Sequence, residues 1–399
     1  MEEQYVAEMK QKITEAVRKC RICMSCYSDC PLYESTNGFV TQGPTGITKS
    51  LYYGILWDAF DGPQGRDLLD IVYSCTTCGS CMIRCKKSAC NIPLVEIIET
   101  GRQLLVEKMV GPLPEQIKVL ESLDREGNPY GEPAEQRTKW IESLDPEIAA
   151  PVKLVKGESK AETLLFVGCT SSYEHDLVNV PESIVKIFNQ LGADYGVLQD
   201  EKCCGEPALR LGEAGLFGDM AEINTASFEN SGAKQIVTIS PHCLHTFRNA
   251  YPNLPDNITV QHYTEFFAAK LRAGNLSPKK SLSKKVTYHD PCYLGKRSDI
   301  YEAPRQILES IAGDSFVEMH RNRGQSLCCG GGGGRMFVEM EAVERLSEKR
   351  VQHALDVGAE IIATACPWCY TQIADGIKTS KNESRIIVKD LAELLAECI

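Results

Sequence analysis

The sequence predicts an α/β protein in which a helical N-terminal domain precedes two pseudo-symmetric halves, each built from parallel βαβ units. Three observations predict this fold class. Apolar residues recur at helical spacing through the first 123 residues. In the rest of the chain, short apolar runs alternate with helical segments, which is the pattern of parallel βαβ units. The cysteines of that part recur at intervals of 123 to 126 residues, so we interpret it as an internal duplication.

The composition is that of a cysteine-rich globular protein of two or three domains. The chain has 399 residues and 19 cysteines, and a chain of this length needs no disulfides to stabilise its core. Its 43 basic and 54 acidic side chains give a net charge of −11, which disfavours nucleic acid as a partner. No secretory signal and no apolar run of about 18 residues is present. We therefore expect a cytoplasmic protein whose cysteines bind metals.

We divide the chain into a domain over 1–123, a connector over 124–160, and two halves over 161–280 and 281–399. In the first domain, helices are predicted over 4–19, 46–60, 65–74, 93–109 and 113–123. The connector contains the turn-forming stretch 127–133 and a predicted helix over 134–144. Taken alone, it reads as an interdomain linker.

The two halves show the same order of elements. The pattern in the first half predicts strands over 163–168 and 233–237 and helices over 181–191 and 212–231. In the second half the counterparts are strands over 285–289 and 359–362 and helices over 304–311 and 339–357. Ligands of such sheets bind beyond the carboxyl ends of the strands, where the cysteines of both halves are expected.

Two cysteine runs with identical spacing lie in the first domain, and both resemble the run of bacterial ferredoxins. In that run three thiolates bind one 4Fe–4S cubane and the fourth ligates the other cluster. We therefore predict one cluster at Cys20, Cys23, Cys26 and Cys85, and the other at Cys75, Cys78, Cys81 and Cys30. Zinc ribbons use separated pairs of cysteines, so a pair of zinc sites is disfavoured.

The second run departs from the ferredoxin pattern at one point. Pro31 follows Cys30 as the pattern requires, whereas Lys86 follows Cys85. Cys90 lies five residues after Cys85 and competes with it for the ligand role. The three-residue spacing favours Cys85.

The second half carries five thiols on three loops, which is one more than a tetrahedral zinc site uses. Two of them are adjacent and point apart when the chain is extended, so both can bind only a cluster larger than one ion. The five glycines 330–334 are expected to let the backbone approach inorganic sulfide closely. We predict an iron–sulfur site, and the better candidate for chemistry, at Cys292, Cys328, Cys329, Cys366 and Cys369.

The first half has one thiol fewer. Its cysteines are Cys169, Cys203, Cys204 and Cys243, and Ser240 stands where the second half has Cys366. Because serine oxygen is a poor ligand for iron, this site is expected to hold a smaller or altered cluster, or none. Four polar residues flank the cysteines and are expected to hydrogen-bond carbonyls or sulfides rather than to bind iron: His242, His245, His289 and Asp290.

The cysteine pattern of the second half, one Cys, then Cys-Cys-Gly, then a final Cys-x-x-Cys pair, resembles the CCG (cysteine-rich) domain of the heterodisulfide reductase family, and the first half repeats it with Ser240 in place of one cysteine of the pair. The resemblance implies a noncubane 4Fe–4S cluster at the five cysteines of the second half, which we call the complete site. The helix-separated runs of the first domain resemble the helical dicluster ferredoxin domain of succinate dehydrogenase iron–sulfur subunits. As a whole, the chain looks like the D-type polypeptide of heterodisulfide reductase.

The resemblance implies an oxidoreductase subunit and leaves three functions open. The preferred one is electron transfer in an anaerobic heterodisulfide-reductase-like complex, between a flavoprotein partner and an acceptor such as a membrane cytochrome b or quinone. Ser240 favours this function, because the reductase resemblance implies two complete noncubane sites. The second is catalytic cleavage of a CoM-S-S-CoB-type disulfide. The third is an iron–sulfur subunit of a lactate, glycolate or glycerol-3-phosphate dehydrogenase that delivers electrons to quinone.

Overall fold

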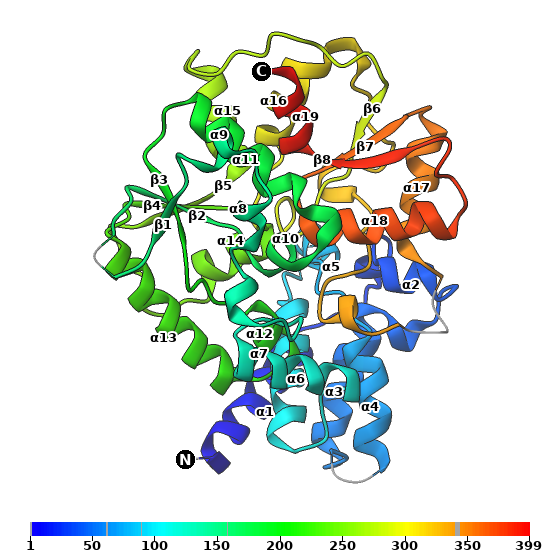
Figure 1. The fold of residues 1–399 in the computed structure, drawn as a ribbon. Coiled ribbons are helices and arrows are strands. Elements are labelled where there is room, and N and C mark those ends of the chain that lie inside the picture. The colour runs from blue at the N-terminus through cyan, green and yellow to red at the C-terminus, as the bar shows by residue number, and fades with distance from the viewer. Residues whose placement is uncertain (1, 61–62, 89, 158, 340–343) are drawn as a thin grey trace.

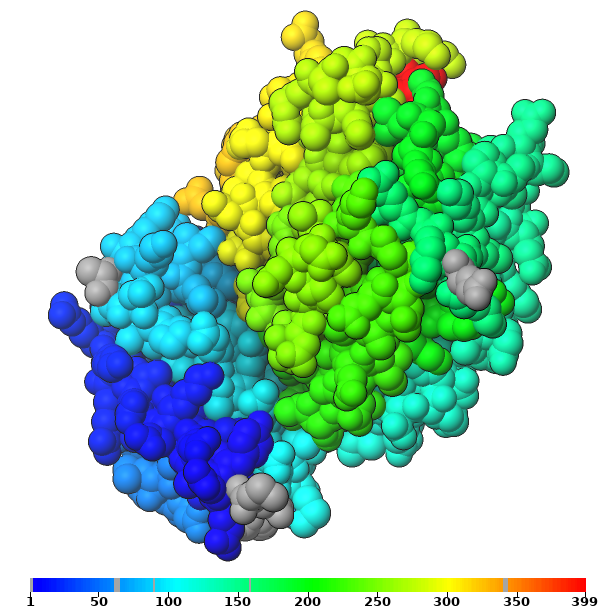
Figure 2. All heavy atoms as spheres, turned by 90° about the vertical axis from the view of Figure 1, so that its left-hand side faces the viewer, coloured from blue at the N-terminus to red at the C-terminus, as the bar shows by residue number. Residues whose placement is uncertain are grey.

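The computed structural model describes residues 2–60, 63–88, 90–157, 159–339 and 344–399. Figure 1 shows a helical N-terminal domain at the bottom and two sheet-containing halves above it. Figure 2 views the left-hand side of the molecule and shows the blue N-terminal domain packed against the green first half. The predicted fold class is confirmed, because the structure has a helical region followed by two parallel sheets covered by helices.

The described part of the N-terminal domain is helical, and four of its helices begin with a proline. Proline is tolerated in the first helical turn because its missing N–H has no partner there in any case. The helices are α1 (Glu2–Arg18), α2 (Pro31–Ser35), α3 (Pro44–Leu56), α4 (Pro63–Tyr73), α5 (Ser80–Lys87), α6 (Leu94–Glu107) and α7 (Pro114–Glu126). The apolar face predicted for the first helix is buried at Met9, Ile13 and Val17. Helix α6 supplies the centre of the domain, with Leu104 and Leu105 fully buried.

The connector is more ordered than a linker and contributes to the fold. It contains two short helices, α8 (Lys139–Glu142) and α9 (Pro146–Ala149), and the strand β1 (Lys153–Val155). The helix predicted over 134–144 is wrong in length, since a 3₁₀ turn at Ala134–Gln136 is separated from α8. Strand β1 pairs in parallel with β3 (Tyr195–Leu198), so the connector forms an edge of the first sheet.

The first half is built on a five-stranded parallel sheet with strand order β1-β3-β2-β4-β5. Its remaining strands are β2 (Thr163–Phe166), β4 (Gln235–Thr238) and β5 (Thr259–His262). Strand β2 is buried along its whole length, as expected for a strand covered on both faces. The helices are α10 (Cys169–Tyr173), α11 (Asn179–Gln190), α12 (Glu206–Leu211), α13 (Ala214–Ser231), α14 (Pro241–Asn249) and α15 (Tyr263–Arg272).

The second half repeats this arrangement on a smaller sheet. Its order is β6-β7-β8, with strands β6 (Val286–Tyr288), β7 (Ile361–Thr364) and β8 (Ile387–Asp390). A parallel bridge between Val286 and Phe316 occupies the place of the β2–β3 pair. The helices are α16 (Glu302–Ala312), α17 (Leu346–Asp356), α18 (Pro367–Thr379) and α19 (Leu391–Cys398). Short 3₁₀ turns lie at Ser25–Tyr27, Val40–Gln42, His175–Leu177, Gly313–Ser315, Arg323–Gln325 and Arg335–Phe337.

The two halves pack on each other through equivalent helices. Helix α11 contacts α19, and α16 contacts both α15 and α19, so four helices form a shared core. Figure 1 shows these helices between the two sheets. Cysteine loops follow the carboxyl ends of strands in both sheets, and those of the second half reach the N-terminal domain, where Cys78 packs with Cys292 and Cys328.

Two sequence expectations need correction here. The helix predicted over 339–357 is shorter, because α17 begins at Leu346; residues 340–343 of that prediction lie outside the described residues. Strands β3, β5 and β8 and helices α15 and α19 were not predicted. Strands β5 and β8 are fully buried only at every second residue, so they lack the continuous apolar run that predicted β2 and β7.

Candidate metal centres

The loop after α1 and the end of α5 bring the first predicted set of thiols together. Cys20, Cys23, Cys26 and Cys85 line one small cavity. The Sγ atom of Cys26 lies 3.2 Å from Oγ1 of Thr45, at the start of α3. Because Cys85 comes from the second cysteine run, the structure has the crossed arrangement that the spacing predicts.

The second predicted set lies around another cavity. Cys30 lines it together with Cys75, Cys78 and Cys81, and the remaining walls are largely apolar, including Ile47, Val95 and Ile98. Each of the two sets therefore offers four thiols around one enclosed space. Thiolate donors in an apolar surrounding fit an iron–sulfur cluster.

Cys90 lies at the first cavity as well, beside Cys85. The backbone N–H of Ile92 donates to Sγ of Cys85 at a distance of 3.1 Å. A thiolate that accepts such a bond is favoured in its charged form, which suits a ligand. The preference for Cys85 over Cys90 stays a prediction.

The five cysteines of the second half divide into two groups, as expected for adjacent residues that point apart. Cys328 packs with Cys292 and with Cys78 of the N-terminal domain. Cys329 packs with Cys366, Trp368 and Cys369, and its Sγ atom lies 3.4 Å from that of Cys369. The complete site is thus in direct contact with the second set of ferredoxin-type thiols through Cys78.

The four cysteines of the first half line a third cavity. Cys169, Cys203, Cys204 and Cys243 surround it, and Ser240 lies in its wall. The Oγ atom of Ser240 accepts a hydrogen bond from the backbone N–H of His242 at 3.2 Å and so caps helix α14. Cys366 occupies the same position before α18 and makes no such bond. Ser240 therefore caps a helix in the first half, at the position where the second half has a thiol.

The connector places a positive charge, that of Arg137, at the third cavity. Arg137 is buried, and its Nη1 atom lies 3.2 Å from Sγ of Cys169. The guanidinium also pairs with the buried carboxylate of Glu201, which accepts hydrogen bonds from the backbone N–H groups of Val167 and Gly168, both at 2.9 Å. Neither residue was predicted from the sequence. A lone arginine in a turn-rich segment carries no local pattern that could have identified it.

His242 links the two halves at the cysteine sites. Its Nδ1 atom lies 3.0 Å from the carboxylate of Glu206, and its ring stacks on Tyr293 with 3.9 Å between centroids. Burial alone would lower the pKa of His242, but Glu206 and Cys366 raise it to about 9. Burial would raise the pKa of Cys366, whereas hydrogen bonds with Cys369 and His242 lower it to about 5. Each of the two groups therefore favours the charged form of the other.

His289 accepts a hydrogen bond at one ring nitrogen and lies near two thiols. Nε of Arg350 donates to Nδ1 of His289 at 3.0 Å, so the ring proton is on Nε2, which has no partner among the described residues. One of the two ring nitrogens lies within 4.8 Å of the Sγ atoms of Cys329 and Cys369. Burial, and then Arg350, lower the pKa of His289 well below its usual value. The hydrogen bond from His289 to sulfur that the sequence suggests stays a prediction.

The other two flanking residues have structural partners. Asp290 is buried and pairs with Arg305 at 2.7 Å. His245 lies 3.1 Å from Nη2 of Arg297, and burial followed by Arg297 lowers its pKa to about 2. Both therefore hold loops of the second half in place, through side chains rather than through the carbonyls or sulfides that we expected.

The glycine loop lies directly against the N-terminal domain. A Cβ atom on Gly332 would lie 2.5 Å from the carbonyl oxygen of Thr76, and one on Gly333 would lie 2.4 Å from that of Cys75. Contacts this short are forbidden, so these glycines let the second half approach the backbone of the N-terminal domain. The close approach of this loop to inorganic sulfide that the sequence suggests stays a prediction.

Arg102 on α6 joins all three parts of the molecule. Its Nη1 atom donates to the carbonyl oxygens of Arg210 in the first half and of Gly333 in the second half, at 2.8 and 2.9 Å. Its Nη2 atom donates to that of Cys75 at 2.7 Å. A fully buried guanidinium bound by carbonyls fixes the loops that carry the cysteines.

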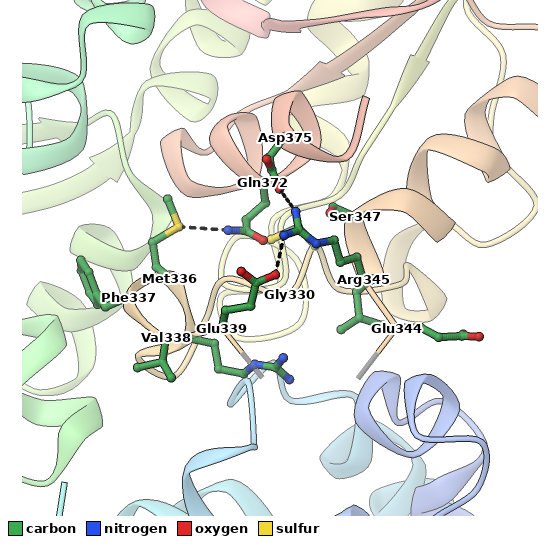
Figure 3. Close-up of a pocket in the computed structure, with 13 residues that line it drawn as sticks. Gly330, Met336, Phe337, Val338, Glu339, Glu344, Arg345, Ser347, Gln372 and Asp375 are labelled. Carbon is green, nitrogen blue, oxygen red and sulfur yellow. Dashed lines mark hydrogen bonds and ion pairs between the residues drawn. The ribbon is translucent and has the colours of Figure 1, made fainter. Parts of the chain in front are cut away.

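A solvent-accessible pocket of about 320 Å³ opens at Cys329. Figure 3 shows Met336, Phe337 and Val338 on one side of it and Gln372 and Arg345 on the other. Arg345 pairs with Glu339 and Asp375 across the pocket. The complete site can therefore be reached by a small molecule, which the sequence did not reveal.

Two family descriptions match the chain. The cysteine-rich (CCG) domain matches residues 163–248 and 286–374, and the 4Fe–4S dicluster domain matches residues 16–89. The D-type polypeptide of the dihydromethanophenazine:CoB–CoM heterodisulfide reductase of Methanosarcina barkeri is 31% identical over 401 residues, covering 95% of this chain and 93% of that polypeptide. The chain belongs to this family. The resemblance noted in the sequence is confirmed.

Other members of the wider family are longer proteins. The probable iron–sulfur-binding oxidoreductase FadF of Bacillus subtilis is 35% identical over 330 residues. The EtfAB:quinone oxidoreductase of Syntrophomonas wolfei is 35% identical over 336 residues. Each match covers 82% of this chain and 46% of the relative, so the chain spans about half the length of these curated relatives. The heterodisulfide reductase family thus includes iron–sulfur oxidoreductases of different overall build.

The family and the donor atoms agree on the kind of cofactor. The matched dicluster and CCG domains indicate iron–sulfur clusters, and three of the four predicted ligand sets offer thiols around a common space. In the part of the chain that the structure describes, no helix is both long and apolar enough to span a membrane. The cytoplasmic location expected from the sequence stays a prediction.

Proposed function

We propose that this chain is the iron–sulfur electron-transfer subunit of a heterodisulfide-reductase-like oxidoreductase complex. Its partner would be a flavoprotein, and the acceptor a quinone or a membrane cytochrome b. The names of the relatives support this choice, since one is an EtfAB:quinone oxidoreductase and another belongs to a heterodisulfide reductase. The direction of electron flow is not part of the proposal.

The observation that carries the proposal is the contact between Cys78 and Cys328. It joins a thiol set of the N-terminal domain to the complete CCG set of the second half. Bound iron–sulfur clusters at these sites would take up and release single electrons. The chain's own residues bring the two sets together: Oγ1 of Thr77 lies 2.9 Å from the hydroxyl of Tyr293, and Nζ of Lys296 donates to Oγ of Ser80 at 2.6 Å.

For the cofactors we propose two 4Fe–4S cubanes and one noncubane cluster, held by the ligand sets that the sequence predicts. The first cubane set is Cys20, Cys23, Cys26 and Cys85, and the second is Cys30, Cys75, Cys78 and Cys81. The complete CCG set is Cys292, Cys328, Cys329, Cys366 and Cys369. The first half, at Cys169, Cys203, Cys204 and Cys243, would hold an altered cluster or none.

Metal analysis of anaerobically purified protein tests the cofactor content. We expect about eight irons for the two cubanes and roughly three to four more for the complete CCG site, with little zinc. Zinc near stoichiometry, with iron well below eight, would contradict the assignment.

The crossed ligation has its own test. Cys85→Ala should remove the cluster held by Cys20, Cys23 and Cys26 and leave the other cubane intact, as observed by EPR of the reduced protein. Cys90→Ala is the matched control, since Cys90 lines the same cavity. Loss of the signal in the Cys90 variant alone would reverse the choice of ligand.

The pocket at Cys329 favours a second candidate function, the reduction of a disulfide. That reaction takes two electrons and two protons per disulfide and yields two thiols. The photoreduced protein should be mixed anaerobically with a quinone analogue, such as menadione, and separately with a dialkyl disulfide. Reoxidation by the quinone alone supports electron transfer. Stoichiometric release of thiols that is lost in Cys329→Ala would establish the reductase instead.

A further inference from the structure

Cys23 marks the place where the N-terminal domain opens to solvent. All 19 cysteines lie in the described part of the chain, and among them Cys23 alone is exposed. Its neighbours in the loop, Ile22 and Met24, are also exposed, with 56% and 39% of their surface accessible. Both have positive φ angles, 53° and 60°, which are rare for such residues and turn the loop around the thiols.

The surroundings of Cys23 are strongly basic, although the chain is acidic overall. Segments 16–28 and 80–93 carry six basic residues and no acidic residue, whereas the chain has a net charge of −11. The loop that carries Cys20, Cys23 and Cys26 lies next to helix α5, because cysteines of both segments line one cavity. Arg84 is neutralised by Asp29. Five cations remain exposed, and none pairs with a described acidic residue: Arg18, Lys19, Arg21, Lys86 and Lys87.

Apolar side chains at the centre and charges at the rim are the anatomy of a protein-binding surface. Here the centre is Ile22, Cys23 and Met24, and the rim is the five cations. We call this surface the Cys23 patch. Figure 2 shows the blue N-terminal segment on the face where it borders the segment of α5 and α6.

We propose that the Cys23 patch is the docking surface for an acidic redox protein, which exchanges electrons with the chain at this point. The inference rests on the proposed electron-transfer function and names the place and the chemistry of the partner contact. Electron transfer requires a short distance between the two redox groups, and the exposed thiol is the part of the first cysteine set that a partner can approach. A cationic rim attracts an acidic partner and accelerates its association by about 10- to 1000-fold.

An anionic membrane would also attract the cations, but the patch lacks the side chains that membranes favour. Surface-bound proteins insert Trp, Phe and Leu among their basic residues. The exposed aromatic residues of the domain are Tyr5, Phe39, Tyr53 and Trp57, and the last two lie at the other end of α3. Thr45, at the near end, contacts Cys26, so about 18 Å of helix separates Trp57 from the cysteine loop. Within the described residues, the patch itself contains no exposed tryptophan or phenylalanine.

The test compares two triple variants with the same change in charge. Arg21→Glu/Lys86→Glu/Lys87→Glu alters the patch. Lys279→Glu/Lys280→Glu/Lys284→Glu alters three exposed lysines between α15 and β6, at the top of Figure 1 and far from the N-terminal domain. The probe is flavodoxin, a small acidic flavoprotein. Its binding in the oxidised state is measured by calorimetry, and electron transfer from its hydroquinone by stopped-flow absorbance.

We expect the patch variant to lose at least about tenfold in affinity and in rate at low salt, with the difference vanishing near 0.5 M salt. The control variant should stay within about twofold of the wild-type protein. All three proteins should be reduced to the same extent by a photoreduced deazaflavin, which needs no docking surface. Failure of that reduction in every protein would refute the proposed function rather than the docking surface.

Two results would overturn the proposal. Equal losses in the two triple variants would show that only the net charge matters. Sedimentation of the wild-type protein with phosphatidylglycerol vesicles, lost in the patch variant while flavodoxin binding is unchanged, would identify the patch as a lipid-binding surface.

Discussion

The two CCG halves share a fold and differ in what surrounds their cysteines. Strands β2, β4 and β5 correspond to β6, β7 and β8, and each central strand ends at a cysteine loop. The first site is closed, with Arg137 against Cys169 and Ser240 bound to the backbone of α14. The second site has a fifth thiol, a pocket and a direct contact with Cys78.

The difference begins directly after the paired cysteines. In the first half, Gly205 is followed by helix α12, which packs on α6 and α7. In the second half the chain continues as a glycine loop that lies on Cys75 and Thr76. One copy of the duplicated unit therefore supports the assembly with a helix, whereas the other brings its thiols to the N-terminal domain.

Exchanging Cys366 and Ser240 should have the largest effect, because the two residues occupy equivalent positions. Cys366→Ser removes the fifth thiolate, so we expect electron transfer to acceptor to fall by at least about 100-fold while both cubanes remain reducible. Ser240→Cys should raise the iron content of the protein with little change in rate. It should also lower stability by about 1 kcal/mol, since α14 loses its cap.

Iron content, cubane EPR and turnover with the same electron donor measure both variants. Full turnover in Cys366→Ser would mean that the complete site is structural. Loss of turnover only on replacing Cys169, Cys203, Cys204 or Cys243 would place the chemistry in the first half.

Replacing Arg137 tests whether the first site depends on the connector. Arg137→Ala leaves the buried carboxylate of Glu201 without its cation, which costs about 3–5 kcal/mol of unfolding free energy. The matched control is Arg125→Ala, because Arg125 forms an exposed pair with Glu126, a kind of contact worth about 0–1 kcal/mol. Urea unfolding followed by circular dichroism measures both. Similar losses of unfolding free energy in the two variants would show that the buried pair contributes no more to stability than the exposed pair.

Gly332→Ala tests the contact between the second half and the N-terminal domain. The new methyl group would meet the carbonyl oxygen of Thr76 at 2.5 Å, so the loop must move, at a cost of about 1–3 kcal/mol. Gly218→Ala in α13 is the control, since nothing lies within 4 Å of its Cβ position and alanine favours a helix. Hydrogen exchange of segment 74–80 should rise in the first variant only. Unchanged exchange there would mean that the contact is dispensable.

The cysteine spacing was sufficient to predict which thiols meet, and the alternation of strands and helices was sufficient to predict the duplicated fold. Both are local patterns with a fixed geometric consequence. The ligand assignments themselves stay predictions. What could not be predicted depends on contacts between distant segments: Arg137 at Cys169, Arg102 bound by three loops, and Gly333 against Cys75. No sequence periodicity predicts such contacts, because they form only when the N-terminal domain and the two halves pack together.

Equivalent helix caps in the two halves should respond to pH in opposite directions. His262 caps α15 and Asp390 caps α19, and the hydroxyl of Tyr263 donates to Asp390 at 2.6 Å across the boundary between the halves. Burial lowers the pKa of His262 to about 3. Burial raises the pKa of Asp390 to about 8.

The sign of each effect follows from proton binding. Between about pH 3 and 6.5 the unfolded chain protonates His262 and the folded chain does not, so its contribution to stability is lost as pH falls. Between about pH 4 and 8 the folded chain holds a proton on Asp390 that the unfolded chain releases, so stability decreases as pH rises through this window. Asp390→Asn keeps a capping side chain and removes the titration. It should abolish a decrease of about 1 kcal/mol between pH 6 and 7, whereas His262→Asn should leave that decrease unchanged. Apparent Tm values of both variants across pH 5 to 9 provide the measurement, and parallel profiles for wild type and Asp390→Asn would show that Asp390 is ionised throughout.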